Sequence, residues 1–334
     1  MENHRFVETD SKGRTKLVKF EGLSYYKYLC KAKWWVFNSN TRYFVKPTKE
    51  QVYVQTWHGT PLKKIGLDVL LEGSALTDKN EKTRIYNDEA KKLSYMIAPS
   101  EYTKEKLISA FNLKAYNKQE KVLTFGYPRN DKLSACKTED IINIKNRLKI
   151  SLDKKVLLYA PTFRDNKYNV SKGFTLEHKF DFEKFYETFA DRYVILFRSH
   201  YFISEKLDKS AMKNVIDVSK EDDITDILLV SDLLITDYSS VLFDYANLKR
   251  PMIFYMYDID EYKNSVRDFY IDTNTLPGPV CKDFDKVLKE IEEWEEADGS
   301  KDFINEKYID FYERFCSIDN GDSAEKICKT VFKI

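Results

Sequence analysis

Residues 233–247 read LLITDYSSVLFDYAN, and this stretch decides the fold that we expect. Leu233–Thr236 predicts a buried strand, the polar residues after it predict a tight turn, and Ser240–Asn247 predicts a helix. A strand that is apolar along most of its length is typical of a parallel sheet covered by helices on both faces. The stretch therefore predicts one strand–helix unit of a doubly wound α/β sheet.

Similar apolar runs, separated by longer amphipathic stretches, recur along the chain in two groups. The first group of predicted strands is Leu17–Phe20, Trp34–Asn38, Val52–Trp57, Tyr95–Ala98 and Val122–Gly126, and the second is Val156–Ala160, Tyr193–Phe197, Val215–Val218, Leu233–Thr236 and Met252–Met256. Helices such as Glu101–Ala110 and Phe182–Phe189 are predicted between these strands. The alternation indicates two α/β sheets.

A polar stretch with a helical pattern, Asn130–Leu152, separates the two groups and marks the predicted domain boundary. The length of 334 residues also suits two cores better than one. We expect an N-terminal domain over residues 1–135, a second domain over 136–300, and C-terminal helices over 301–334 that Gly321 interrupts.

Composition excludes several classes of protein. The net charge of +1 offers no basic excess for a nucleic-acid partner. The 5 cysteines are widely spaced without a CxxC pair, which predicts neither a metal site nor a disulfide framework and favours a reducing cytoplasm. The N-terminus is polar, unlike a signal peptide, and no apolar run approaches the roughly 18 residues that span a bilayer. Any membrane contact is therefore expected to be peripheral.

The usual nucleotide-binding fingerprints are missing. No two glycines lie two residues apart, so GxGxxG does not occur, and neither GKS nor GKT is present. This weighs against a Rossmann dehydrogenase and a P-loop NTPase. Phosphate groups would have to be held by other elements, and the ends of the predicted strands are the place to look.

The stretch QTWHGTPLKK at residues 55–64 follows one such strand. His58 can act as a general base or donate to a phosphate, and Gly59 allows a ligand to approach the backbone closely. The alternative is a histidine that only caps a strand by hydrogen bonding.

Two further strand ends carry basic side chains. Arg164 in APTFRD, residues 160–165, can offer a planar fork to a diphosphate, or it can be a surface arginine paired with Asp165. Arg198 and His200 in FRSHY, residues 197–201, share a face of an extended chain and can hold an anion between them. A plain ion network is the alternative for this pair.

The turn Asp237–Ser240 precedes the helix of the opening stretch. Ser239 or Ser240 would cap that helix, and its free N–H groups could bind a phosphate. An ordinary serine cap is the alternative. Surface features are less specific: Tyr25, Tyr26, Tyr28, Trp34 and Trp35 can mark an interfacial or acceptor surface or simply pack in the core, and the pairs Lys63–Lys64 and Lys91–Lys92 can face anionic lipid or water.

Taken together, the motifs resemble one family. TWHGTPLKKIG at 56–66, APTFRD at 160–165, FRSH at 197–200, ITDYSSVLFDYANLKRPMIFY at 235–255, LPGP at 276–279 and FYERFCSIDNGDSAEK at 311–326 are similar to the CDP-glycerol glycerophosphotransferases, which include the primases and polymerases of wall teichoic acid. The resemblance implies a GT-B fold, in which two Rossmann-like domains face a cleft and C-terminal helices cross back to the first domain.

The resemblance also assigns the site. It implies that His58 and His200 are the essential histidines and that Ser239 and Ser240 lie near the donor diphosphate. We expect Gly59, Thr60, Arg164, Arg198, Asp237, Ser239 and Ser240 to bind substrate, with no metal and no cofactor beyond the donor CDP-glycerol. Relatives usually have more chain before Leu17, so the acceptor domain is expected to be trimmed or minimal, and Asp322 stands where a basic residue is more usual.

The expected reaction is attack by an acceptor hydroxyl on the phosphorus that bears glycerol, with release of CMP. The resemblance implies a cytoplasmic enzyme at the inner face of the membrane, a lipid-linked glycan or polymer acceptor, and a role in teichoic acid or capsule synthesis. Three alternatives stay open: a CDP-ribitol or hexose-phosphate transferase of the same family, a GT-B glycosyltransferase that uses a nucleotide sugar, and a non-catalytic nucleotide-binding scaffold.

Overall fold

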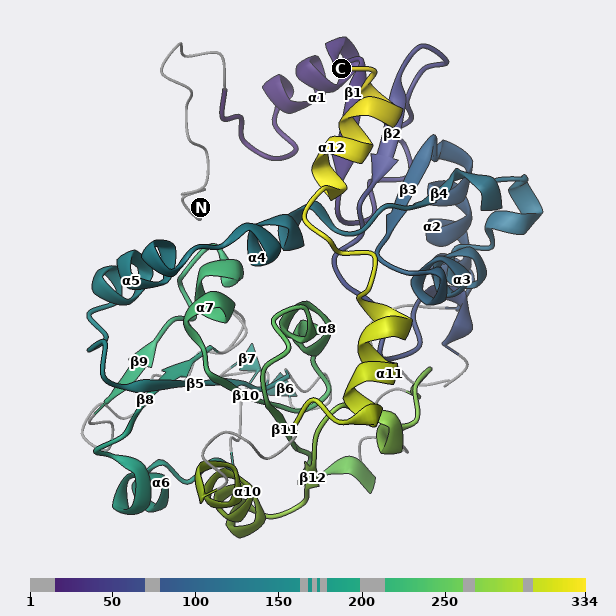
Figure 1. Ribbon diagram of the computed structural model, residues 1–334. Coiled ribbons are helices and arrows are strands. Elements are labelled where there is room, and N and C mark those ends of the chain that lie inside the picture. The colour runs from purple at the N-terminus through teal and green to yellow at the C-terminus, as the bar shows by residue number, and fades with distance from the viewer. Residues whose placement is uncertain are drawn as a thin grey trace.

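The computed structural model describes residues 16–69, 79–162, 168–169, 173–174, 179–198, 214–260, 268–296 and 303–334. Within them the chain forms two separate parallel sheets and a small antiparallel pair, β6 (Tyr168–Asn169) with β7 (Gly173–Phe174). The two large sheets form separate α/β layers that lie side by side (Figure 1). Short 3₁₀ turns connect several elements at Gly66–Asp68, Leu113–Tyr116, Gln119–Lys121, Pro128–Asn130 and Thr273–Thr275.

The first sheet has four parallel strands in chain order: β1 (Trp34–Phe37), β2 (Val52–Gln55), β3 (Tyr95–Ala98) and β4 (Val122–Thr124). Helices α2 (Lys79–Lys92) and α3 (Glu101–Ala110) connect its strands. Their apolar side chains, such as Ala90 and Leu107, pack with Tyr53 and Met96 of the sheet in one buried cluster. Ser100 caps α3 by accepting a hydrogen bond from the backbone N–H of Thr103, which fixes where that helix begins.

The second sheet has the strand order β12-β11-β10-β5-β8-β9, which is the doubly wound Rossmann order. Its strands are β5 (Lys155–Ala160), β8 (Tyr193–Phe197), β9 (Val215–Asp217), β10 (Leu233–Thr236), β11 (Met252–Tyr255) and β12 (Val280–Cys281). The order reverses between β5 and β10, which begin the two halves of the sheet. A ligand of such a sheet binds at the carboxyl ends of these two strands.

Helices cover both faces of the second sheet, which explains why its strands are apolar throughout. Val156 and Leu158 of β5 pack with α7 (Ile224–Val230) and α8 (Val241–Ala246) on one face. Leu157 and Tyr159 pack on the other face with α6 (Phe182–Phe189) and α10 (Phe284–Glu296). Successive side chains of a strand point to opposite faces, so both sets are buried.

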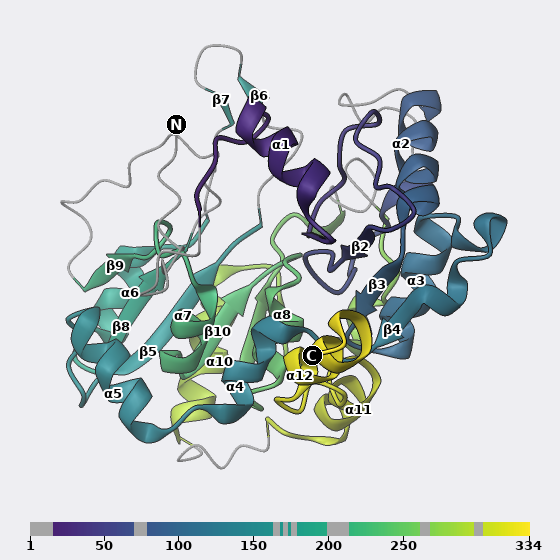
Figure 2. The same cartoon turned by 90° about the horizontal axis from the view of Figure 1, so that it is seen from above.

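The C-terminal helices cross from the second sheet back to the first. In α11 (Glu306–Phe315), Phe311 stacks on Phe243 of α8 with ring centroids 5.4 Å apart, and Phe315 packs edge-on against Tyr102 of α3 at 4.8 Å. After Gly321, whose φ of +93° breaks the helix, α12 (Ser323–Ile327) continues into a π-helical turn (Cys328–Phe332) that packs on Val54 and Ile97. Figure 2 shows this C-terminal segment, in yellow, at the junction of the two sheets. The predicted crossing is confirmed.

The predicted boundary stretch contains α4 (Asp131–Ala135) and α5 (Thr138–Arg147). Both helices lie against α7 of the second sheet, where Lys132 pairs with Asp226 and Arg147 pairs with Glu221 and Asp226. The exact division into domains stays a prediction.

One prediction at the N-terminus is wrong, and one helix there was not predicted. Leu17–Phe20 is not a strand but an exposed, irregular segment, because no neighbouring strand pairs with it. Beside it, the aromatic run that follows Gly22 forms a helix, α1 (Leu23–Lys31), that has no buried residue. The pair Lys91–Lys92 was considered to face lipid or water, but Lys92 is buried and forms an ion pair with Glu89.

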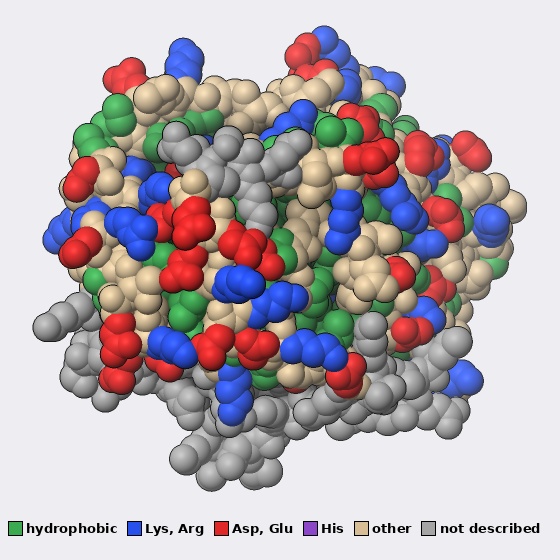
Figure 3. All heavy atoms as spheres, turned by 60° about the horizontal axis from the view of Figure 1, so that its bottom comes forward, with side chains coloured by type: hydrophobic (Ala, Val, Ile, Leu, Met, Phe, Trp, Pro, Cys, Tyr) green, Lys and Arg blue, Asp and Glu red, His purple; other side chains and the backbone are tan. Residues whose placement is uncertain are grey.

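Acidic and basic side chains are interspersed on the face shown in Figure 3, as the near-zero net charge suggests. Among the described residues, no helix combines the length and the apolar character needed to cross a bilayer.

Candidate active site between the two sheets

A cavity of about 440 Å³ lies where the carboxyl ends of both sheets meet. The first sheet contributes the segment 57–63 and Ile65, which follow β2. The second sheet contributes 160–162 after β5, Arg198 after β8, and 238–241 after β10, together with Ile224. Six of the predicted site residues thus line one space: His58, Gly59, Thr60, Arg198, Ser239 and Ser240.

Gly59 lies close to Ser240 on the other side of the cavity. A Cβ atom on Gly59 would lie 2.8 Å from Oγ and 3.3 Å from Cβ of Ser240. Any larger residue at this position would therefore force the Ser240 side chain to shift. The stretch that follows β2 and the turn that follows β10 act as the two walls of a single site.

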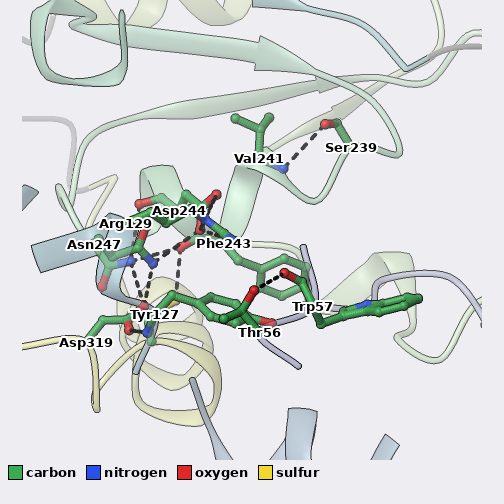
Figure 4. A network of polar contacts seen from close by, with 12 residues as sticks. Thr56, Trp57, Tyr127, Arg129, Ser239, Val241, Phe243, Asp244, Asn247 and Asp319 are labelled. Atoms are coloured by element: carbon green, nitrogen blue, oxygen red, sulfur yellow. Dashed lines mark hydrogen bonds and ion pairs between the residues drawn. The ribbon is translucent and has the colours of Figure 1, made fainter. Parts of the chain in front are cut away.

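The turn that presents His58 is held in an unusual conformation. Trp57 has a φ of +54°, a region that bulky side chains rarely adopt. Its backbone N–H donates to Oε1 of Gln55 at 2.9 Å, and its ring packs edge-on against Phe111. The hydroxyl of Thr56 also donates to the carbonyl of Trp57, at 3.2 Å (Figure 4). Such strain persists where the surroundings enforce it, commonly at functional sites.

His58 is oriented by its backbone surroundings. Its Nδ1 lies 2.9 Å from the carbonyl oxygen of Asn38. Because a carbonyl oxygen only accepts, Nδ1 carries the proton, and the neutral ring has its lone pair on Nε2. The ring also stacks on Trp57, with centroids 4.0 Å apart. A histidine with one fixed N–H and one open lone pair is arranged as a general base.

The pKa of His58 is lowered. Desolvation by the surrounding groups is the main cause, and the positive charge of Arg129 adds to it, while the hydrogen bond to Asn38 opposes both. The side chain nevertheless remains exposed to the cavity. The histidine is thus neutral and accessible near pH 7.

This gives a prediction for the pH dependence of turnover. The base works only when neutral, so kcat/KM should fall as pH drops through the lowered pKa of His58. We expect the acid limb of a kcat/KM profile to have its midpoint below the ordinary histidine value of 6.5. A midpoint above 6.5 would show that His58 is not the group that titrates.

On the second side of the cavity, Asp237 organises the strand ends. Its buried Oδ1 accepts hydrogen bonds from the backbone N–H groups of Thr162, at 2.8 Å, and Tyr238, at 2.6 Å. The carboxylate therefore ties the loop after β5 to the turn after β10, at the point where the strand order of the sheet reverses.

The two serines of this turn have different roles. Ser239 Oγ accepts from the backbone N–H of Val241 at 3.3 Å and so caps α8. Ser240 occupies the N-cap position, yet its side chain makes no capping hydrogen bond. Its half-buried hydroxyl lines the cavity and is placed to interact with a ligand.

Arg198 is half-buried and already makes structural contacts. Its Nη1 donates to the carbonyl oxygens of Val218, at 2.9 Å, and Glu221, at 2.7 Å. These bonds hold the guanidinium at the edge of the cavity. Desolvation lowers the pKa of Arg198, and the nearby carboxylates of Glu221, Asp222 and Asp223 oppose this shift, so the charge is held in partly dry surroundings.

Two predicted site residues, Arg164 and His200, lie outside the described residues. The described residues contain no group of three or more His, Cys, Asp or Glu side chains that could hold a metal ion. The expectation of a metal-free site stays a prediction.

A buried polar network that the motifs did not reveal lies next to this site (Figure 4). Arg129 pairs with Asp244 of α8 at 3.0 Å, and Asn130 donates to both Asp244, at 3.2 Å, and Asp319, at 2.6 Å. Asp319 Oδ1 also accepts from the backbone N–H of Tyr127 at 2.6 Å. The network joins the segment after β4, helix α8 and the C-terminal segment, and burial raises the pKa of Asp319 to about 6.

A second contact joins the two halves of the chain beside the cavity. The backbone of Leu62–Lys64 pairs with Asp268–Tyr270: the N–H of Lys64 donates to Asp268, at 2.9 Å, and the N–H of Tyr270 donates to Leu62, at 3.0 Å. Lys64 and Asp268 also form an ion pair. The stretch after His58 is therefore fastened to the second half of the chain.

Two Rossmann-like α/β units that face a cleft, with C-terminal helices that cross back, define a protein of the GT-B class. Within that class, the chain belongs to the family described as CDP-glycerol:poly(glycerophosphate) glycerophosphotransferase, whose profile matches residues 2–333. The family predicted from the motifs is thereby confirmed.

Individual relatives agree with this assignment. The chain is 38% identical to the teichoic acid glycerol-phosphate transferase of Staphylococcus aureus, over 95% of this chain and 80% of that protein. It is 40% identical to the teichoic acid poly(glycerol phosphate) polymerase of Staphylococcus epidermidis, over 96% of this chain but only 44% of that protein. The solved structure of the wall teichoic acid polymerase TagF superposes with a TM-score of 0.85 at 39% identity, over 95% of this chain and 76% of that one.

Proposed function

We propose that this chain transfers glycerol phosphate from CDP-glycerol to a hydroxyl group of a membrane-linked acceptor and releases CMP. The observation that carries the proposal is that His58 and Gly59, which follow a strand of the first sheet, line one cavity with Arg198 and Ser240, which follow strands of the second. A base thus lies on one side and anion-binding groups lie on the other. Family membership supplies the donor.

The donor diphosphate is placed on the side of the second sheet. Ser240 offers a hydroxyl without a capping partner, and Arg198 supplies positive charge close to it. As the bridging oxygen leaves with CMP, negative charge grows on that phosphate, and fixed donors in a partly dry site stabilise it. Arg164 and His200, which follow β5 and β8 in the sequence, are proposed to supply further positive charge that stabilises this phosphate.

His58 is proposed to act on the acceptor. Its Nε2 takes the proton of the acceptor hydroxyl while the hydroxyl oxygen bonds to the phosphorus that carries glycerol. The bond from that phosphorus to the bridging oxygen breaks, and CMP leaves with the electron pair. Phosphoryl transfer depends mainly on positioning and charge stabilisation, which these side chains provide.

The acceptor is proposed to reach the cavity from a membrane surface, where the chain binds peripherally on the cytoplasmic side. Leu17, Phe20, Leu23 and Phe44 are more than half exposed, with Leu23 at 93%. Ring contacts join Phe20 to Tyr25 and Tyr26 to Phe44, so these side chains form one N-terminal apolar surface. Lysines that flank it or lie within it, Lys16, Lys19, Lys27 and Lys31, suit anionic lipid headgroups.

This surface gives a testable prediction. The double variant Phe20→Ser, Leu23→Ser should bind vesicles that contain phosphatidylglycerol at least about tenfold more weakly than the unchanged chain, because two exposed apolar side chains no longer enter the lipid. Flotation of vesicles on a density gradient measures this. The matched control is Ile142→Ser, Leu152→Ser, which removes exposed apolar side chains elsewhere. Equal binding by all three proteins would show that the N-terminal apolar surface does not bind the membrane.

The reaction itself is tested by transfer of label to a lipid-linked disaccharide acceptor, with or without one glycerol phosphate already attached. CDP-[¹⁴C]glycerol, CDP-[¹⁴C]ribitol and a labelled UDP-sugar are supplied in parallel. Label transferred from CDP-glycerol alone is the expected result, and the product length separates addition of one unit from polymerisation. Transfer from CDP-ribitol alone would show that the donor carries ribitol instead of glycerol. Transfer from the UDP-sugar alone would overturn the proposal.

A further inference from the structure

We propose that Gln55, a buried amide at the end of β2, is a positioning residue that sets the orientation and the tautomer of His58. The inference rests on the proposed role of His58 as the base. Gln55 does not line the cavity and does not touch a substrate; it acts through the turn that carries His58 and through the segment to which His58 is bonded.

The contacts of Gln55 join these two elements. The side chain is only 1% exposed. Its Oε1 accepts from the backbone N–H of Trp57 at 2.9 Å, which holds the left-handed residue just before His58. Its Nε2 donates to the carbonyl oxygen of Ser39 at 3.0 Å, one residue after the Asn38 carbonyl that accepts from His58. One amide therefore fixes both the base and its hydrogen-bond acceptor.

Gln55 is itself held by a buried network that extends to α2. Its Nε2 also donates to the hydroxyl of Tyr53 at 3.2 Å, and that hydroxyl donates to Glu89 at 2.6 Å. Glu89 accepts from both the backbone N–H and the hydroxyl of Thr41, at 2.8 Å and 2.7 Å, and pairs with buried Lys92. The segment that follows β1 is thus anchored from two directions, and buried networks of this kind hold a single geometry.

The tautomer of His58 depends on this geometry. With the Asn38 carbonyl in place, the proton stays on Nδ1, and the lone pair of Nε2 is free to accept the acceptor's proton. Free neutral histidine prefers the opposite tautomer, in which the proton is on Nε2. If the segment after β1 moves, His58 can adopt that tautomer, and its lone pair then lies on the nitrogen that faced Asn38.

The test is the variant Gln55→Met, which keeps the length of the side chain and removes both hydrogen-bonding functions. With ¹⁵N-labelled histidine, long-range proton–nitrogen spectra above the histidine pKa report the tautomer, and the chain has only 4 histidines to distinguish. The His58 signal is identified by its loss in His58→Asn. We expect His58 to change from the Nδ1–H to the Nε2–H form, and kcat to fall by about 10²-fold while the KM for the donor stays unchanged.

Gln51→Met is the matched control. Gln51 uses its Nε2 in the same way at the other end of β2, where it donates to the carbonyl oxygens of Leu29 and Ala32, both at 2.7 Å. Its Oε1 accepts from the backbone N–H of Thr48 at 2.9 Å. Gln51 is only half-buried, so its loss should destabilise the fold no more than the loss of Gln55, and it should leave the tautomer of His58 and kcat unchanged.

The proposal is overturned if Gln55→Met keeps the Nδ1–H form of His58, or if Gln51→Met shifts the tautomer equally. Should Gln55→Met not fold, Gln55→Glu replaces it, because it retains the acceptor for Trp57 and removes the Nε2 donor to Ser39 and Tyr53. The spectrum needs no turnover. A shifted tautomer in a chain that does not use CDP-glycerol would therefore support Gln55 as a positioning residue while the proposed function fails.

Discussion

The substitution His58→Ala should lower kcat by about 10²–10⁴-fold, the usual cost of losing a general base. The fixed Nδ1–H bond to Asn38 and the lowered pKa leave the neutral ring with one accessible lone pair, on Nε2. The proposed donor site is on the opposite side of the cavity, so the KM for the donor should change little. Single-turnover measurements with saturating CDP-glycerol separate the two effects.

Imidazole provides the control for this variant. Added to His58→Ala, it should restore part of the lost rate, because the truncated side chain leaves room in a cavity that is open to solvent. Circular dichroism establishes that the variant is folded. Turnover close to that of the unchanged chain in folded His58→Ala would show that His58 is not the base.

The substitution Arg129→Met should lower the free energy of unfolding more than any other substitution proposed above. It leaves the carboxylate of Asp244, whose side chain is only 12% exposed, without its charged partner and close to Asp319. Breaking a buried ion pair by removing one partner typically costs 3–5 kcal/mol, and the 31% exposure of the Arg129 side chain places the expected loss near the lower end, at about 3 kcal/mol. Urea unfolding measures the change in the free energy of unfolding.

Arg147→Met is the matched control, because Arg147 also pairs with two carboxylates but has a side chain that is 46% exposed. Its loss should cost less than about 1 kcal/mol. Arg129→Met should also raise the pKa of His58, since the positive charge of Arg129 helps to lower it. Equal losses of stability in the two variants would mean that the network around Asp244 and Asp319 does not hold the two α/β units together.

Local patterns predicted the fold because the central strands of the second sheet are buried on both faces. The apolar runs at Tyr193–Phe197 and Leu233–Thr236 coincide with strands for this reason. Leu17–Phe20 has a similar composition but no strand beside it, and pairing cannot be deduced from composition. The aromatic helix α1 was missed because it buries none of its residues and so lacks the pattern of a packed helix.

The site could be predicted as far as it follows strand ends. His58, Arg198 and the two serines of the TDYSS turn were found in this way, and they line one cavity. The groups that orient them were not found, because their partners are remote in the sequence. Arg129 bonds to a residue 115 positions away, and Asn130 to one 189 positions away. Gln55 did leave a signal: it is a polar residue at the end of a strand of otherwise apolar and aromatic residues.

In the proposed reaction the acceptor attacks phosphorus rather than carbon, and the nucleotide that is released distinguishes the two. The reaction of CDP-glycerol with a lipid-linked acceptor can be followed by ³¹P NMR. We expect the diphosphate signals to give way to one phosphomonoester, CMP, and one new phosphodiester in equal amounts, and His58→Ala to slow the appearance of both together. The appearance of CDP, with its diphosphate intact and no new phosphodiester, would show instead that the bond to glycerol carbon is broken and that phosphorus is not attacked.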